Sequence, residues 1–506
     1  MADTTFTGTL EQNHAQAIEQ AMDGLAIDAW IDGQSVSARS GERFETFDPA
    51  VKEPITSVAR CEESDIDRAV TAARAAFERE WRTTTPQDRA AIIHEWMATL
   101  RDHLDELALL ESLDTGKPLA NAREETEDAI SFFEYYVSVA QAHEGANLPT
   151  GDHAHTYTRI EPYGVAGLIL PWNFPLLLTG WKVGAALAAG NTVVCKPSEE
   201  APLSITRIAQ LSAGILPDGV FNVVNGYGEE AGAPLTTHAD VDKLSFTGSV
   251  PVGQLVMKAA ADNVTPVTLE LGGKSPFIVF PDADIEAAAE TTAMGIYYNT
   301  GQTCDACSRI LVHESVHDEF VAAFEDAAAA YQPGDPLVEG TEMGPLSFQA
   351  QHEKVSKYVS LGTEEGARVI AGGEPPLDNE LADGWFFEPT IFDGVDNTMR
   401  IAQDEIFGPV QCIITFSDYE EAIELANDVD YGLASGVATG DMSLAHRAAA
   451  DIQAGSVWIN EYFGGGAGAP FGGYKYSGFG RECAKETLDE YTHTKAVGLS
   501  LDETDL

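Results

Sequence analysis

The sequence predicts an α/β protein with two doubly wound domains and a cleft between them. Its 506 residues exceed what a single hydrophobic core usually holds. From residue 160, short apolar runs alternate with helical patterns, and a second such series begins near residue 275 and continues to about residue 475. Uninterrupted apolar strands joined by helices are typical of a parallel sheet that is covered on both faces. Sheets of this kind commonly bind nucleotides.

The elements follow in order along the chain. Residues 28–60 predict short strands separated by turns, and residues 64–140 predict several amphipathic helices. The first apolar series then predicts strands at 164–170, 191–197, 221–226 and 243–248. A helical pattern at 202–214 lies between the second and third of these, and the second series opens with a strand at 275–280.

The chain is strongly acidic, with 81 Asp plus Glu against 29 Lys plus Arg and a formal net charge of −52. Such a field repels nucleic acid and anionic membranes, so neither is expected as a partner. The acidic residues are dispersed through the predicted helices, which is typical of solvation rather than of a partner site. Molar salt, with a Debye length of about 3 Å, would screen their repulsion. The composition therefore predicts a halophilic source.

The location expected from the sequence is the cytoplasm. No run of about 18 uncharged apolar residues is present, so no membrane span is predicted. The first 20 residues contain no basic segment followed by an apolar core, which predicts no secretory signal.

Two of the six cysteines, Cys304 and Cys307, lie close together in "NTGQTCDACSR". This C-x-x-C is open to three interpretations: a redox pair, half of a metal site, or one nucleophile with an incidental neighbour. A four-ligand zinc site needs two more ligands at suitable spacing, and no second C-x-x-C occurs, so we predict no metal. An uncharged, glycine-containing loop suits Cys304 as a reachable, partly ionised nucleophile. Cys307 then either closes a local disulfide or is a buried small hydrophobe.

Two further polar residues lie in apolar or rigid surroundings. Glu270 stands in the apolar strand of "VTLELGGKSP", where burial would raise its pKa and suit a general base. A strand-end glutamate that faces solvent is the alternative. Asn173 lies between the prolines of "PWNFP", a rigid frame for an amide that donates to an oxyanion.

Two segments have features of a dinucleotide site. Gly248 and Gly253 bracket a turn between a strand and a helix, and the free N–H groups of a helix N-terminus suit a pyrophosphate. The spacing differs from G-x-G-x-x-G, so a plain turn is the alternative. In "KPSEE", Lys196 and Glu199 form a pair that either holds a ribose or is solvated.

Eight motifs together resemble the aldehyde dehydrogenase superfamily, in family order over roughly residues 25–500: "PWNFPLLLTGWKVGAALAAGNTVVCKPSE", "FTGSVPVG", "LELGGKSP", "GQTC", "EIFGPV", "YGLASGV", "GSVWIN" and "PFGGYKYSGFGRE". The resemblance implies three parts. These are an NAD(P)-binding domain from 1–142 and 161–271, a catalytic domain from 272–480, and an oligomerisation arm with a C-terminal segment from 143–160 and 481–506. Exposed strand edges in the arm would build a homodimer or homotetramer.

The resemblance also implies a reaction, the NAD(P)-dependent oxidation of an aldehyde to a carboxylic acid. Cys304 would attack the aldehyde, and the Asn173 amide would hold the oxyanion. Hydride transfer to the nicotinamide would leave a thioester, which water activated by Glu270 would hydrolyse while Glu482 relays the proton. NAD is the expected cofactor, with NADP possible, because Glu199 would accept the ribose 2′-hydroxyl and repel a 2′-phosphate.

The remaining site residues fall into two groups. The predicted cofactor contacts are Trp172, Lys196, Glu199, Gly248, Ser249, Gly253, Gln351, Lys354, Glu405 and Phe407. The predicted substrate pocket consists of Phe174, Trp181, Phe471 and Glu461. The aromatic residues could equally be core, and Glu461 either favours a cationic or polar aldehyde or faces solvent. Lys182 matches a lysine near the active site, with no role assigned, and the small-molecule aldehyde itself is not identified.

Three rival functions remain from the sequence. A CoA-acylating aldehyde dehydrogenase is the nearest, although such enzymes commonly lack a carboxylate at the position of Glu270. A thiol redox protein built on the C-x-x-C and a catalytically silent protein on the same fold are the other two.

Overall fold

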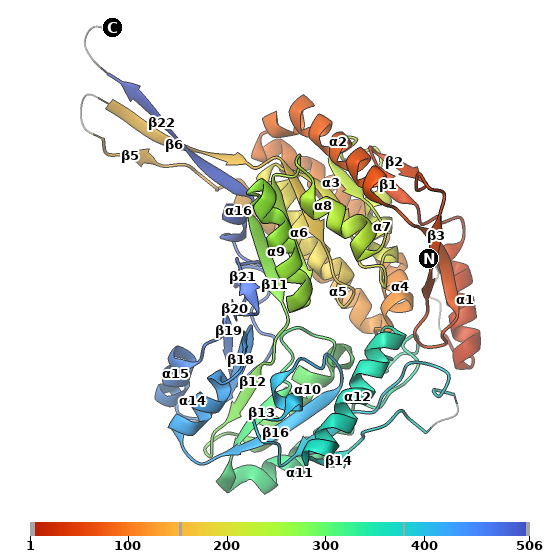
Figure 1. The fold of residues 1–506 in the computed structure, drawn as a ribbon, viewed down its shortest axis with the longest axis vertical. Helices are drawn as coiled ribbons and strands as arrows, with labels where there is room; N and C mark the ends of the chain where they lie inside the picture. Colours follow the sequence, from red (N-terminus) through yellow and green to blue (C-terminus); the bar gives the residue numbers. More distant parts are fainter. Residues whose placement is uncertain (1–5, 151–153, 378–379, 502–506) are drawn as a thin grey trace.

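The structure is a computed structural model, and it describes residues 6–150, 154–377 and 380–501. Figure 1 shows two bodies, each built around a sheet with helices on it, and a ribbon of strands that projects from them. Within the described ranges, every helix is too short or too polar to cross a lipid bilayer.

The first sheet has eight strands in the order β2-β1-β9-β8-β7-β10-β11-β21, and the five from β9 to β11 are parallel. The four strands predicted from the first apolar series are confirmed as β7 to β10. The chain leaves β7 toward β8 on one side and later returns to β10 on the other, so the order reverses between β7 and β10. Ligands bind beside such a reversal, at the carboxyl ends of the strands. The bounds are β1 Ala29–Ile31, β2 Gln34–Val36, β7 Val165–Ile169, β8 Thr192–Lys196, β9 Phe221–Val223, β10 Lys243–Gly248, β11 Val267–Leu271 and β21 Gly478–Phe479.

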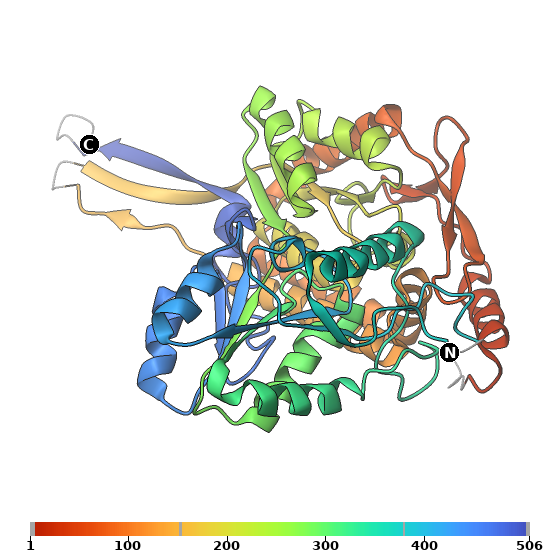
Figure 2. The same ribbon diagram turned by 60° about the horizontal axis from the view of Figure 1, so that its bottom comes forward.

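Helices cover both faces of this sheet, as Figures 1 and 2 show. Helix α6 is buried on nearly every side, which is typical of a helix inside a core. A Cβ on Gly180 of α6 would lie 2.7 Å from the carbonyl oxygen of Ala129, so only glycine lets α5 approach this closely. The helices are α1 Leu10–Met22, α2 Glu63–Arg79, α3 Pro86–Asp102, α4 Leu104–Thr115, α5 Leu119–Ala140, α6 Pro175–Ala189, α7 Leu203–Gln210, α8 Ala233–Thr237 and α9 Val250–Asn263.

The second sheet has seven strands in the order β14-β15-β16-β13-β12-β18-β19, and all except β14 run parallel. The strand predicted at 275–280 is confirmed as β12. The strands are β12 Pro276–Val279, β13 Arg309–His313, β14 Arg368–Ala371, β15 Thr390–Asp393, β16 Val410–Phe416, β18 Ala434–Ala438 and β19 Ser456–Ile459. The helices are α10 Ile285–Tyr297, α11 His317–Ala328, α12 Gln349–Glu365, α13 Arg400–Gln403, α14 Tyr419–Asn427 and α15 Met442–Asp451. The short helix α16 Thr487–Glu490 packs on α6 of the first body.

Three antiparallel strands form the arm, and in both views it projects away from the two sheets. Its long strands pair continuously from Thr492 opposite Pro162 to Ser500 opposite Ala154. The arm strands are β5 Asn147–Leu148, β6 Ala154–Pro162 and β22 Thr492–Ser500. Smaller ribbons pair β3 Arg43–Phe47 with β4 Pro54–Ala59, and β17 Tyr431–Gly432 with β20 Tyr474–Lys475. Strand β21, from the segment expected in the catalytic domain, completes the edge of the first sheet.

Candidate active site

A cavity of about 800 Å³ is lined by residues of both sheets and their connecting loops. It gathers most of the residues predicted from the sequence: Trp172, Asn173, Phe174, Trp181, Gly248, Ser249, Cys304, Gln351, Lys354, Glu405, Phe407, Glu461 and Phe471. The wall does not include Lys196, Glu199, Gly253, Glu270 or Glu482.

The loop that carries Cys304 has an unusual backbone. After α10, Asn299 and Thr300 have φ values of 50° and 58°, in the left-handed region that costs such residues about 1–3 kcal/mol each. Buried Gln302 holds this turn, because its Nε2 donates to the Asn299 carbonyl at 3.2 Å and its Oε1 accepts from the Ser347 amide at 3.0 Å. Sequence reasoning missed Gln302, since one amide side chain before a cysteine gives no signal of its partners.

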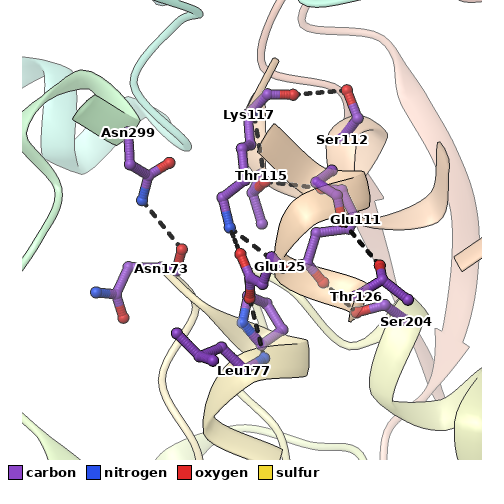
Figure 3. Close-up of polar contacts among 12 residues, drawn as sticks. Glu111, Ser112, Thr115, Lys117, Glu125, Thr126, Asn173, Leu177, Ser204 and Asn299 are labelled. Atoms are coloured by element: carbon purple, nitrogen blue, oxygen red, sulfur yellow. Dashed lines mark hydrogen bonds and ion pairs between the residues drawn. The ribbon is translucent and has the colours of Figure 1, made fainter. Parts of the chain in front are cut away.

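Asn173 is fixed against the same loop. Its Nδ2 donates to the Gln302 carbonyl at 3.0 Å. Asn299 Nδ2 donates to the Asn173 carbonyl at 3.0 Å (Figure 3). Among the described residues, Asn173 Nδ2 has this one acceptor, so its second N–H is available to a ligand. The backbone N–H of Cys304 also has no acceptor there. Two donors are thus present at the cysteine.

Cys304 is partly exposed in the cavity wall, as a nucleophile must be. Burial raises the pKa of its thiol well above the usual value, and Asp305, Glu270 and Glu405 add to the rise. This rise runs against the partly ionised thiol expected from the sequence, and its main cause is the burial of the sulfur, with the three carboxylates adding to it. The sequence places only Asp305 beside it.

Cys307 points away from the cavity into the core of the second body. It is fully buried, its Sγ lies 3.5 Å from the Thr292 carbonyl, and a Cβ on Gly295 would come within 2.6 Å of that sulfur. All six cysteines are unpaired. The structure thus places Cys307 as a small core residue. In the part of the chain that the structure describes, no group of three or more His, Cys, Asp or Glu could hold a metal ion.

Glu270 lies in β11, behind the cavity wall, and is 4% exposed. Neither of its carboxylate oxygens has a hydrogen-bond partner among the described residues. Burial raises its pKa well above the usual value, Glu482 raises it further, and Lys182 and Arg481 oppose the rise. The raised pKa expected from the apolar strand is confirmed, and the solvent-facing alternative is wrong.

Glu482 and Lys182 form a buried ion pair next to Glu270. The Lys182 Nζ lies 2.5 Å from Glu482 Oε1 and 3.0 Å from Ser245 Oγ. Glu482 is also tied to the cavity wall, because it exchanges two backbone hydrogen bonds with Phe471 at 2.8 and 2.9 Å. Glu270, Lys182 and Glu482 therefore form a cluster of titratable side chains directly behind the cavity wall.

Glu405 sits on the double glycine that follows β11. Its Oε1 accepts from the Gly273 amide at 3.0 Å, and a Cβ on Gly272 would lie 2.3 Å from its carboxylate. Only glycine at 272 leaves room for this contact. Phe407 has a φ of 63°, and Gln351 Nε2 holds its carbonyl at 2.5 Å. Phe407 is half-buried in the cavity wall rather than in the core.

The chain matches the family model described as "Aldehyde dehydrogenase family" over residues 35–497. It belongs to the aldehyde dehydrogenase family. An aldehyde dehydrogenase of Emericella nidulans is 45% identical over 471 residues, which cover 92% of this chain and 94% of the relative. The betaine aldehyde dehydrogenase of Bacillus subtilis is 44% identical, with 92% and 96% covered.

Solved structures agree with the sequence relatives. An indole-3-acetaldehyde dehydrogenase in complex with NAD+ matches with a TM-score of 0.93 and 42% identity, covering 98% of this chain and all of that one. The betaine aldehyde dehydrogenase of Staphylococcus aureus with NAD+ matches with a TM-score of 0.94 and 39% identity, covering 97% and 98%. The protein is an NAD-dependent aldehyde dehydrogenase, an enzyme that oxidises a small aldehyde to the acid.

The aldehyde dehydrogenase has residues that fit this cofactor. Ser249 is the N-cap of the 14-residue helix α9 and lines the cavity, so the N-terminus of this helix begins at the cavity wall. The buried Thr247 Oγ1 lines the same wall and has no partner among the described residues. Trp172 and Phe407 make an edge contact at 5.3 Å on the side of Glu405. Amides, an unpaired hydroxyl and aromatic faces together suit a dinucleotide.

Three of the predicted cofactor contacts lie off the cavity wall. Lys196 ends β8 and pairs with Glu199 at 2.7 Å, next to the end of β7. This is the edge at which the strand order reverses, where such sheets bind ligands, although the pair does not line the cavity. A Cβ on Gly253 would lie 2.6 Å from the Leu271 side chain, which shows that this glycine serves the packing of α9 on β11.

Proposed function

We propose that Cys304 is the nucleophile of this aldehyde dehydrogenase, Asn173 its oxyanion donor and Glu270 its general base. The proposal depends on one observation. The accessible thiol of Cys304 and a free N–H of the Asn173 amide lie in the cavity wall, and the buried carboxyl of Glu270 lies behind that wall. The influence of Glu270 on the pKa of Cys304 supports their closeness.

The first step forms a bond between Cys304 Sγ and the aldehyde carbon. The thiol loses its proton, the carbonyl electron pair moves to oxygen, and the resulting oxyanion accepts hydrogen bonds from Asn173 Nδ2 and the Cys304 N–H. The high pKa of the thiol means that its proton must leave as the sulfur attacks, and water in the open cavity accepts it. When bound, the nicotinamide ring supplies the hydride acceptor.

The oxidised adduct on Cys304 is a thioester, which water must hydrolyse. Glu270 takes a proton as water attacks, the carbon–sulfur bond breaks, and the thiol and the acid are released. Glu482, held by Lys182, can pass that proton on, because its second oxygen has no partner among the described residues. Gly472 leaves space beside Glu270, since a Cβ there would lie 2.9 Å from Glu270 Oε1.

We propose that Glu405, Phe407 and Trp172 hold the nicotinamide end of the cofactor, with Gln351 and Lys354 beside them, and that Ser249 and Gly248 meet the pyrophosphate. Their shared position on the cavity wall supports this. Lys196 and Glu199 hold the adenosine ribose. Phe174, Trp181 and Phe471 line the path of the aldehyde, and Trp181 lies 5.3 Å from the Phe471 ring.

We also propose a homodimer or homotetramer. The outer face of α9 supports this, because Val252, Leu255 and Met257 are 43%, 62% and 52% exposed. The open edges of the arm give a second contact. The three-part division predicted from the sequence, the cytoplasmic location and the halophilic source remain predictions. Light scattering of the purified protein measures its oligomeric state.

The test of the catalytic proposal is Glu270→Gln. We expect a burst of about one NADH per active subunit and then little turnover, because the base acts after the cofactor is reduced. The matched control is Glu290→Gln, an exposed residue of α10, which should keep full turnover. Steady-state turnover in Glu270→Gln equal to the control would remove Glu270 from the mechanism. Acyl-CoA formation with added CoA would favour the acylating rival.

A further inference from the structure

The half of the cavity that lies away from Glu405 combines aromatic rings with carboxylates. Its rings include Phe132, Trp181, Phe463 and Phe471, and its acidic residues are Glu125, Asp128, Asp305 and Glu461. Among the described residues that line the whole cavity, Lys354 is the one lysine, and no arginine or histidine is present. Burial raises the pKa of Glu405 and Lys354 opposes that rise, so this cation belongs to the cofactor side. The half of the cavity away from Glu405, called the substrate side below, is thus lined by carboxylates and by no lysine, arginine or histidine among the described residues.

Asp305 is a buried carboxylate, so the general acidity of the protein surface does not explain its presence in the cavity wall. It is 8% exposed, follows the nucleophile directly and lines the cavity. Within the described ranges, no other residue donates to its side chain, and its own backbone N–H is its one hydrogen-bond partner. Burial raises its pKa to about 7. A buried carboxylate without a counter-ion is unfavourable, and a cationic ligand would stabilise its charged form.

Glu125 differs from Asp305 because it already has partners. It is fully buried with Lys117, and its Oε1 accepts from the Leu177 amide at 3.1 Å (Figure 3). Lys117 also binds Glu111 at 3.2 Å. This charge is compensated within the protein, so Glu125 serves the wall rather than a ligand.

Asp128 and Glu461 lie at the outer part of the cavity, and both are exposed. Asp128 stands one helical turn after Glu125 on α5, and partial burial together with Glu124 and Glu127 raises its pKa. Among the described residues that line the cavity on this side, no lysine or arginine is present to pair with either carboxylate. Together with Asp305 they place negative charge at the outer and inner ends of the substrate side.

Aromatic rings line the cavity between the carboxylates of Asp305, Asp128 and Glu461 and add a second feature that favours a cation. Trp181 lies between Phe132 at 5.7 Å and Phe471 at 5.3 Å, so several ring faces and edges converge on the channel. The face of an aromatic ring attracts an ammonium group, most strongly where water is excluded. Carboxylates and aromatic rings together favour a positive group over a neutral one of the same shape.

We propose that this channel selects aldehydes that carry an alkylammonium group, with Asp305 as the inner specificity residue and Asp128 and Glu461 as the outer ones. The inference rests on the proposed function of Cys304, because it places the aldehyde carbon at that sulfur. Relatives act on aldehydes as different as indole-3-acetaldehyde and betaine aldehyde by their names, so the names do not decide this choice.

The first experiment compares aldehydes of equal shape and different charge. The pairs are (trimethylammonio)acetaldehyde with 3,3-dimethylbutanal, and 4-(trimethylammonio)butanal with 5,5-dimethylhexanal, at constant salt and saturating NAD. At least one charged member should have a kcat/KM about tenfold or more above its neutral partner, the factor expected of a desolvated cation–π contact. Ratios near or below one in both pairs would overturn the proposal.

Variants assign the effect to residues. Asp305→Asn and Glu461→Gln should each lower the ratio of charged to neutral kcat/KM several-fold, whatever they do to the absolute rate. Glu290→Gln, an exposed change on α10 that does not line the cavity, should leave the ratio unchanged. If the ratio survives in both Asp305→Asn and Glu461→Gln, the assignment to these residues is wrong.

A binding measurement separates this inference from the catalytic proposal. Calorimetry on Cys304→Ala should show choline binding more tightly than 3,3-dimethylbutan-1-ol, and Asp305→Asn in that background should remove the difference. If both aldehydes fail to turn over but choline binds selectively, the proposed function fails and the cation site stands. If turnover is normal but choline and the neutral alcohol bind alike, the cation site fails alone.

Discussion

Replacing Lys117 with methionine tests the buried charge cluster beside the cavity. Lys117 lies between α4 and α5, and its side chain and those of Glu111 and Glu125 are fully buried. Its ammonium also lies 4.4 Å from the centre of the Phe174 ring. Methionine keeps most of the side-chain volume but leaves two carboxylates with no cation between them (Figure 3).

The expected loss of stability follows from this geometry. Removing one partner of a buried ion pair typically costs about 3–5 kcal/mol, because an uncompensated charge stays behind. With an unfolding entropy of about 2.1 cal/mol/K per residue, 506 residues give about 1 kcal/mol/K. Lys117→Met should therefore lower the unfolding midpoint by about 3–5 °C if the chain unfolds as one unit.

The measurement is thermal unfolding by circular dichroism at fixed salt. Lys485→Met is the matched control, since Lys485 is 74% exposed and lies 4.0 Å from Glu486, and it should shift the midpoint by less than about 1 °C. The double variant with Glu125→Gln should recover part of the loss, because it removes one stranded carboxylate. A Lys117→Met midpoint equal to the control would refute the argument that this cation compensates the cluster.

Four further predictions address the chemistry and the surface. Cys304→Ala should abolish NADH formation while Cys307→Ala, a buried core change, keeps it; the reverse pattern would reassign the nucleophile. Glu199 should give NAD a higher kcat/KM than NADP, and equal values would show that it does not touch the ribose. Lys182 opposes the rise in the pKa of Glu270, and Glu270 must be ionised to act as the base. Lys182→Met should therefore move the acid limb of the pH profile of thioester hydrolysis to higher pH. An unmoved limb in a stopped-flow pH series would exclude this coupling. Dialysis to about 10 mM salt, where the Debye length is about 30 Å, should inactivate the enzyme, and full retention of activity would count against a halophilic source.

The sequence alone determined those elements whose signal is local. The strands β7 to β10 were readable because each is a short, mainly apolar segment next to a turn signal, and strands of a parallel sheet are buried on both faces. The loop position of Cys304 and the burial of Glu270 followed from their immediate neighbours. Helix α1 was missed, although Thr9 and Gln12 form a capping box that signals its start.

The tertiary structure decided which distant residues meet. Lys182 and Glu482 are 300 residues apart and pair at 2.5 Å, which no local pattern predicts. Beyond burial, the pKa of Cys304 depends on Glu270 of β11 and on Glu405, which are both distant from it along the chain, so no local pattern predicts their part in the rise. Charge and solvation act through space, whereas sequence patterns report only neighbours along the chain. For the same reason the isolated carboxylate of Asp305 is visible only in the folded cavity.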